Sequence, residues 1–295
     1  MSSEHLPGTF RGGDEDEGEQ LIPEETSAVG RMKSKADAIS AKLTSERIER
    51  TLPSEGLKKA FTSIKAATGS IHNLAVLSKQ ENVLEIREKG LLDQKILKTA
   101  PLLYVASGTD IEYPLTLGAR EVIMLDPIFA TRRFVETLKD RIKVLCGSEV
   151  AEEPTGVFRF PFDFGEGAEE VVVRVDPREY GDKTEEARDH LGNPRNLFTP
   201  PAKIGMFLVF QGTDPTVDTE SMDRLVPGGY ILSNRGLEAY TKELFDAEHR
   251  SQFFAAPDSE RRSMVDDAYL QHGFTSVPFD ARDDFSETFV RKVKA

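Results

Sequence analysis

From residue 101 onward, short apolar runs alternate with segments of helical periodicity. The runs Leu102–Ala106 and Glu121–Leu125 are each followed by a segment that gathers its apolar residues on one helix face, residues 111–117 and 128–145. A strand that is apolar along its whole length is buried on both faces, as happens in a parallel sheet covered by helices. The alternation therefore predicts an α/β fold built from strand–helix units.

Further strand-like segments follow, and they include a hairpin and a terminal antiparallel pair. A partly alternating segment and a valine-rich segment flank a Gly-Glu-Gly turn and predict a hairpin, whose second arm is the better candidate for the third parallel strand. The chain ends in two strand-like segments that predict an antiparallel pair. The expected fold is a three-layer Rossmann-like sheet, mostly parallel with a C-terminal antiparallel strand. These strand candidates are residues 157–164, 171–175, 204–210, 230–233, 274–277 and 287–293.

Charge divides the chain unevenly. Residues 1–30 carry eight acids against one base and almost no large apolar side chain, which predicts a disordered acidic tail. Residues 31–98 have helical spacing and an excess of bases, which predicts a helical arm or lid over the mouth of the sheet domain. The α/β domain is expected to occupy residues 99–295.

Composition excludes several classes of protein. A net charge of −13 makes nucleic acid an improbable partner for the body of the chain. The single cysteine, Cys146, rules out an intrachain disulfide framework, and the five histidines have no metal-binding spacing. No apolar run is long enough for a membrane span, and the first residues do not resemble a signal peptide. We expect a cytoplasmic protein without a metal site and without a membrane association; its oligomeric state stays open.

Three local features occur in a meaningful order along the α/β segment. Leu102–Asp110 reads LLYVASGTD, Asp126 closes the second strand, and Leu225–Tyr230 reads LVPGGY. Together they resemble the class I, Rossmann-like, S-adenosylmethionine-dependent methyltransferases, in which the first motif usually reads like VLDLGCGTG and a later turn reads like LKPGG. The resemblance covers residues 100–295. Gly108 keeps the central motif glycine, whereas Ala106 and Asp110 replace the first and third, and Tyr104 stands where an acid is common.

The resemblance implies a set of cofactor-binding residues at the carboxyl ends of the strands. An acid after the second strand accepts hydrogen bonds from ribose hydroxyls, and a glycine in the first loop lets the backbone approach a ligand. Asp176 is the candidate for the adenine end, with Asp163 as its rival. The implied cofactor-binding residues are Ala106, Ser107, Gly108, Asp110, Asp126, Pro127, Asp176 and Gln211.

The residues also bear on which cofactor this crevice would take. Asp110 and Glu112 would repel a pyrophosphate at the start of the first helix, and the dinucleotide pattern G-x-G-x-x-G is absent. A sulfonium cofactor carries no phosphate, and these acids would favour its ammonium group. S-adenosyl-L-methionine is therefore preferred over a dinucleotide. A catalytic residue is not identified; Asp214 is a weak candidate for a base, and a helix cap is the stronger interpretation of it.

Three functions remain open at this point. The first is a methyltransferase acting on an unknown acceptor, with a small molecule or a protein favoured as substrate. The second is a non-catalytic scaffold that kept the methyltransferase fold and lost the cofactor. The third and weakest is a nucleotide-dependent oxidoreductase. Retention of Gly108 and Asp126 favours an enzyme, whereas the two replaced glycines favour the scaffold.

Overall fold

The computed structural model describes seven stretches of the chain and contains one large mixed sheet. The described stretches are residues 28–64, 72–153, 156–177, 201–209, 219–233, 247–278 and 288–293. The nine strands follow the order β3-β4-β5-β2-β1-β6-β7-β9-β8. The predicted acidic tail, residues 1–30, lies outside these stretches except for its last three residues.

Five parallel strands form the centre of this sheet, and antiparallel strands extend both edges. Strand β1 pairs in parallel with β2 and β6, and the parallel set continues through β5 and β7. β9 pairs antiparallel with β7 and β8, and β4 pairs antiparallel with β5 and β3. The predicted mostly parallel α/β fold with a C-terminal antiparallel strand is confirmed. The strands are β1 (Leu102–Val105), β2 (Glu121–Leu125), β3 (Glu152–Glu153), β4 (Val157–Asp163), β5 (Ala168–Asp176), β6 (Ile204–Val209), β7 (Leu225–Ser233), β8 (Phe274–Ser276) and β9 (Thr288–Lys292).

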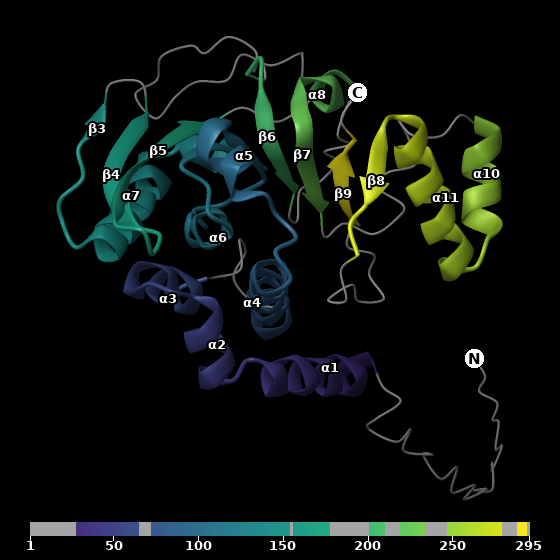
Figure 1. Ribbon diagram of the computed structural model, residues 1–295, viewed down its shortest axis with the longest axis horizontal. Helices are drawn as coiled ribbons and strands as arrows, with labels where there is room; N and C mark the ends of the chain where they lie inside the picture. The colour runs from purple at the N-terminus through teal and green to yellow at the C-terminus, as the bar shows by residue number, and fades with distance from the viewer. Residues whose placement is uncertain are drawn as a thin grey trace, which may run out of the picture.

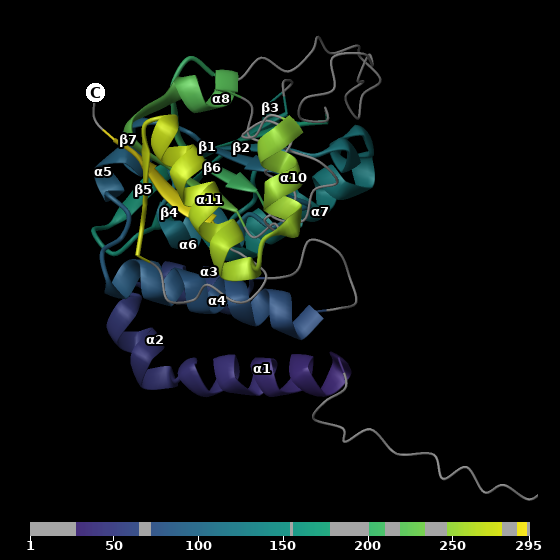
Figure 2. The same cartoon turned by 90° about the vertical axis from the view of Figure 1, so that its right-hand side faces the viewer.

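Helices cover both faces of the sheet, as the apolar strands require. One core packs α6 (Glu112–Leu117) and α7 (Arg132–Cys146) against alternate residues of the strands. The other core packs α8 (Thr219–Arg224), α10 (Ala247–Ala255) and α11 (Asp258–Gln271) against the opposite face. Leu102 and Tyr104 belong to the first core, whereas Leu103 and Val105 belong to the second. Figures 1 and 2 show these layers from two directions.

The Pro227-Gly228-Gly229 turn is built into a strand rather than preceding it. It lies inside β7, where the pairing with β6 shifts register between Ile204 and Met206. A Cβ at Gly229 would lie 2.9 Å from the carbonyl oxygen of Val226 in the same segment and 3.0 Å from that of Gly205 in β6, so there is no room for a side chain. The predicted turn therefore lies within β7: between the pairs Ile204–Leu225 and Met206–Tyr230 the chain advances two residues on β6 and five on β7, and Gly228 has φ 80°.

In the described part of the chain five helices precede the first strand, and three of them, α3, α4 and α5, contribute buried residues to its hydrophobic core. Leu57, Phe61 and Leu84 are buried in the same cluster as Leu102 of β1, so the N-terminal helices pack directly on the sheet domain. Figure 1 shows α1 farthest from the sheet, with α4 between them. The division into a separate arm and domain stays a prediction. These helices are α1 (Ala28–Lys42), α2 (Ser45–Thr51), α3 (Glu55–Thr62), α4 (His72–Glu88) and α5 (Gln94–Thr99).

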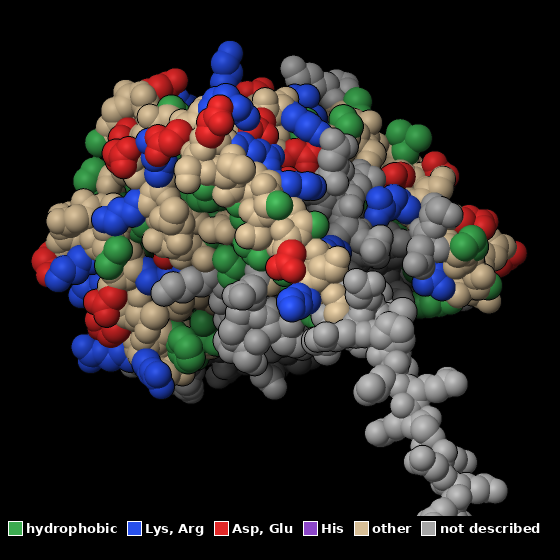
Figure 3. Space-filling view, turned by 90° about the horizontal axis from the view of Figure 1, so that it is seen from below, with side chains coloured by type: hydrophobic (Ala, Val, Ile, Leu, Met, Phe, Trp, Pro, Cys, Tyr) green, Lys and Arg blue, Asp and Glu red, His purple; other side chains and the backbone are tan. Residues whose placement is uncertain are grey.

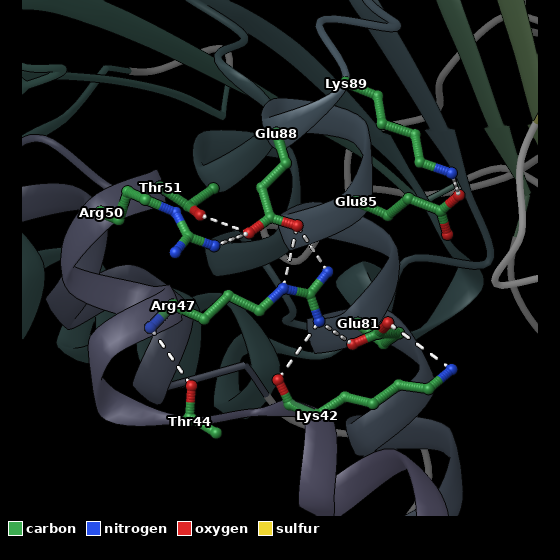
Figure 4. A network of polar contacts seen from close by, with 9 residues as sticks. All are labelled: Lys42, Thr44, Arg47, Arg50, Thr51, Glu81, Glu85, Glu88 and Lys89. Carbon is green, nitrogen blue, oxygen red and sulfur yellow. Dashed lines mark hydrogen bonds and ion pairs between the residues drawn. The ribbon is translucent and has the colours of Figure 1, made fainter.

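The bases of the N-terminal helices are matched largely by acids close to them. On the face seen in Figure 3, blue and red side chains interleave over the residues that the picture colours. Arg47 of α2 binds Glu81 and Glu88 of α4, and Arg50 also contacts Glu88 at 3.0 Å. Figure 4 shows this network, which clamps α2 onto α4. The excess of bases in the sequence therefore does not become a surface of one sign on this face.

Candidate functional site

The loop after β1 turns at two residues with left-handed backbone conformations. Ala106 has φ 51° and Gly108 has φ 55°, and Ala106 is the one described residue other than glycine with a positive φ. The left-handed region costs a residue with a Cβ about 1–2 kcal/mol. Ala106 is held there by its own N–H, which donates to the carbonyl oxygen of Leu125 at 2.9 Å. The loop thus has the conformation of a two-glycine turn, although one glycine has been replaced.

Asp126 joins this loop to the end of β2. Its Oδ2 accepts a hydrogen bond from the N–H of Gly108 at 2.8 Å, and its Oδ1 accepts one from the N–H of Ile128 at 3.1 Å. The second bond caps a short 3-10 helix, η2 (Pro127–Ala130), with Pro127 in its first turn. Asp126 is therefore both a helix cap and a brace for the loop that the sequence assigned to the cofactor.

The two candidates for the adenine end lie at opposite ends of β5. Asp176 ends β5 in register with Leu125, and its carbonyl oxygen accepts the N–H of Asp126 at 3.0 Å. Asp163 pairs with Ala168, the first residue of β5, and therefore lies at the amino end of that strand. Of the two, Asp176 is the residue beside the loop after β1. Gln211 and Asp214 lie outside the described residues.

A buried cluster of charges lies on the other side of the same loop. The Nζ of Lys79, on α4, lies 2.5 Å from Oδ2 of Asp110 and 3.1 Å from the hydroxyl oxygen of Tyr104. The side chains of Lys79 and Asp110 are only 3% and 1% exposed. Burial, together with the charge of Asp110, raises the pKa of Tyr104 well above its ordinary value, so its hydroxyl stays neutral. Asp110 is therefore not a free, exposed acid beside this loop, because it forms a buried ion pair with Lys79.

The second acid of this region, Glu112, is held by α7. The guanidinium of Arg141 binds both carboxylate oxygens of Glu112, and its NH1 donates to the hydroxyl of Thr109 at 3.0 Å. Burial raises the pKa of Glu112 to about 7, and the charge of Asp110 adds to this effect, while the ion pair with Arg141 opposes it. Arg141 thus holds the loop after β1 through Thr109, and its NH2 also lies 3.6 Å from Oδ1 of Asp110.

Sequence reasoning missed Lys79 and Arg141, although a signal for Lys79 existed. Lys79 precedes the buried Val83 by four residues and Ile86 by seven, so it lies on the apolar stripe of α4. A lysine on a buried stripe requires an acidic partner. That partner could not be identified without the tertiary contact between α4 and the loop after β1.

Comparisons with known proteins give no further information about this site. No protein-family model and no curated protein matches the chain. Among solved structures, it is similar to the S-adenosylmethionine-dependent methyltransferase SibL in its apo form, with 13% identity and a TM-score of 0.34, over 92% of this chain and 72% of SibL. It is also similar to a candidate RNA methyltransferase from Pyrococcus horikoshii, with 14% identity and a TM-score of 0.34, over 89% of this chain and 96% of that one. Likenesses at this level carry no argument about function.

The described residues contain neither a membrane-spanning helix nor a cluster of metal-binding side chains. None of the helices there has both the length and the apolar character needed to cross a membrane. Within the same stretches, no three His, Cys, Asp or Glu side chains are grouped so that they would hold a metal ion.

Proposed function

We propose that the chain is an S-adenosylmethionine-dependent methyltransferase whose crevice lies between the loop after β1 and the carboxyl end of β2. The observation that carries the proposal is the backbone of Ala106 and Gly108, which retains the left-handed turn of the glycine motif. This turn lies next to the point where the strand order reverses, between β1 and β6. Open α/β sheets bind their ligands outside the carboxyl ends of the strands at such a point.

The acids at this edge fit the nucleoside end of the cofactor. Each oxygen of Asp126 accepts one backbone N–H, and a carboxylate oxygen can accept a second hydrogen bond, here from a ribose hydroxyl. Asp176, next to it at the end of β5, is assigned to the adenine end. When bound, the cofactor supplies an electrophilic methyl group on its sulfonium. The chain then has mainly to orient an acceptor, for which a small molecule or a protein remains the favoured class.

Calorimetric titration of the wild-type protein with S-adenosylmethionine tests this proposal. We expect wild type to bind and Asp126→Ala to bind about 10-fold or more weakly, because hydrogen bonds to a charged acceptor contribute about 1.5–3 kcal/mol each. Asp126→Asn should lose less affinity for S-adenosylmethionine, since its amide oxygen can still accept a hydrogen bond. Absence of measurable binding of wild-type protein at millimolar S-adenosylmethionine would contradict the proposal.

A matched control separates binding from folding. Asp126→Ala removes the acceptor of two backbone N–H groups and should also lower the free energy of unfolding by about 1–3 kcal/mol. Asp163 accepts the N–H of Gly165 through its Oδ1 at the opposite end of β5, so Asp163→Ala removes one carboxylate acceptor of a backbone N–H away from the loop after β1. We expect Asp163→Ala to destabilise the protein and to bind the cofactor as wild type does.

A second candidate is the non-catalytic scaffold, and one observation favours it. The carboxylates of Asp110, Glu112 and Asp126 all have partners within the chain. A crevice whose polar groups are satisfied internally can persist without a ligand. The scaffold predicts a folded wild-type protein that binds neither S-adenosylmethionine nor NAD, whereas binding of NAD alone would favour an oxidoreductase.

A further inference from the structure

Three side chains beside the loop after β1 form a receptor for an ammonium group. The carboxylate of Asp110 lies 2.5 Å from the Nζ of Lys79, and the hydroxyl oxygen of Tyr104 lies 3.1 Å from it. The same nitrogen lies 5.5 Å from the ring centroid of Tyr113 and 5.9 Å from that of Tyr104. A carboxylate and two aromatic rings around one nitrogen are the usual elements of ammonium recognition.

This receptor adjoins the loop after β1, to which the cofactor is assigned. Tyr104 lies on β1 itself, and Asp110 follows Gly108 by two residues. Gly108 in turn donates its N–H to Asp126, which is assigned to the ribose. The receptor and the ribose acid are therefore both linked to the loop of residues 106–110. A ligand with a nucleoside at one end and an amine at the other would need both.

Asp110 retains one acceptor beyond its bond to Lys79. Its Oδ1 is buried and has no hydrogen-bond partner among the described residues, and NH2 of Arg141 lies 3.6 Å from it. A buried carboxylate oxygen without a hydrogen bond is unfavourable, so the receptor is charge-balanced but not saturated. A ligand ammonium that took the place of the Lys79 ammonium would therefore find an acceptor that Lys79 leaves unused.

We propose that Lys79 determines ligand selectivity by occupying the ammonium subsite of the crevice with its own amine. This inference rests on the proposed function, because it takes the nucleoside end of the ligand to lie at Asp126. Lys79 is part of the chain, so it competes with a ligand amine at a high effective concentration. The ammonium is carried on a flexible four-carbon stem, and exchange requires this buried side chain to leave its contact with Asp110.

The test compares two ligands that differ in the amino-acid part. S-adenosylhomocysteine has an amine and a carboxylate, whereas 5′-methylthioadenosine keeps the adenine, ribose and thioether and lacks both. We expect wild-type protein to bind the two with affinities within about threefold of each other, since the amine gains no new partner. In Lys79→Met, S-adenosylhomocysteine should bind about 10-fold or more tightly than 5′-methylthioadenosine, because its amine then pairs with Asp110.

Two further variants control for charge and folding. Lys79→Arg keeps a cation in the receptor and should behave as wild type. The double variant Lys79→Met/Asp110→Asn removes both charges without leaving a buried ion, and it should show no preference for the amine-bearing ligand. If Lys79→Met does not fold, the relative affinities of wild type and of the double variant for the two ligands still test the inference.

The possible outcomes separate this inference from the proposed function. Wild type that binds S-adenosylhomocysteine about 10-fold or more tightly than 5′-methylthioadenosine would overturn the inference while leaving the proposed function intact. A Lys79→Met variant that loses affinity for S-adenosylhomocysteine would also overturn it, because Lys79 would then be holding the carboxylate. If no variant binds either ligand, the proposed function fails and the inference fails with it.

Discussion

Two ionic networks hold α4, and they differ chiefly in their exposure to water. Toward the sheet, Lys79 and Asp110 are 3% and 1% exposed. Toward α2, Arg50 and Glu88 are 66% and 24% exposed, and the network of Figure 4 continues through Arg47 to Glu81. Both networks use the same chemistry, ammonium or guanidinium against carboxylate, on opposite sides of one helix.

The difference in exposure determines what each network contributes. An exposed ion pair is solvated whether or not it forms, so it adds about 0–1 kcal/mol. A buried ion that loses its partner keeps its desolvation penalty, so breaking such a pair costs about 3–5 kcal/mol. The buried network therefore specifies how α4 sits on the loop after β1, while the exposed pair of Arg50 and Glu88 adds only modestly to the packing of α2.

The largest effect is expected for Asp110→Ala, which leaves the Lys79 ammonium buried without its acid. The free energy of unfolding, measured by denaturant titration, should fall by about 3–5 kcal/mol. Lys79→Met/Asp110→Asn should lose much less than the two single variants together, because no buried charge remains. Additive losses across this double-mutant cycle would show that the two side chains are not coupled.

An intermediate effect on the free energy of unfolding is expected from the titration of Glu112, so it depends on pH. Its pKa of about 7 in the folded protein lies above its ordinary value of 4.5, so the folded state holds this proton more tightly. Its contribution is therefore complete below pH 4.5 and is lost as the pH rises through 7. Relative to Glu112→Gln, which cannot titrate, wild type should lose on the order of 1–3 kcal/mol of stability across this interval. A free energy of unfolding that rises with pH over this interval would mean that Arg141 keeps Glu112 ionised in the folded protein.

The smallest effect is expected in the exposed network. Arg50→Ala should lower the free energy of unfolding by less than about 1 kcal/mol, and the loss should vanish in 1 M salt, where the screening length is about 3 Å. Arg47→Ala is the matched comparison, because Arg47 is 17% exposed and contacts both Glu81 and Glu88. Its loss should be larger and should persist in salt. Equal, salt-sensitive losses would show that burial does not distinguish the two arginines.

The sequence by itself determined the fold class and the order of its parts. Apolar runs such as Leu102–Ala106 predicted buried parallel strands, and the two runs at the end of the chain predicted the antiparallel pair β8 and β9. These features are local, because burial on both faces leaves a continuous apolar run in one short segment. Asp126 was likewise predictable as a helix cap, since an acid before a proline marks the start of a helix.

Only the tertiary structure decided which charges meet at the candidate site. Asp110 was expected to face a ligand's ammonium, but it already binds Lys79, which lies 31 residues earlier in the chain. Asp163 is the last residue of β4 and Asp176 the last residue of β5. Because these two strands pair antiparallel, the two acids lie at opposite ends of the hairpin. Contacts between segments distant in sequence leave no periodic pattern, because a partner is set by how helices and strands pack rather than by neighbouring residues.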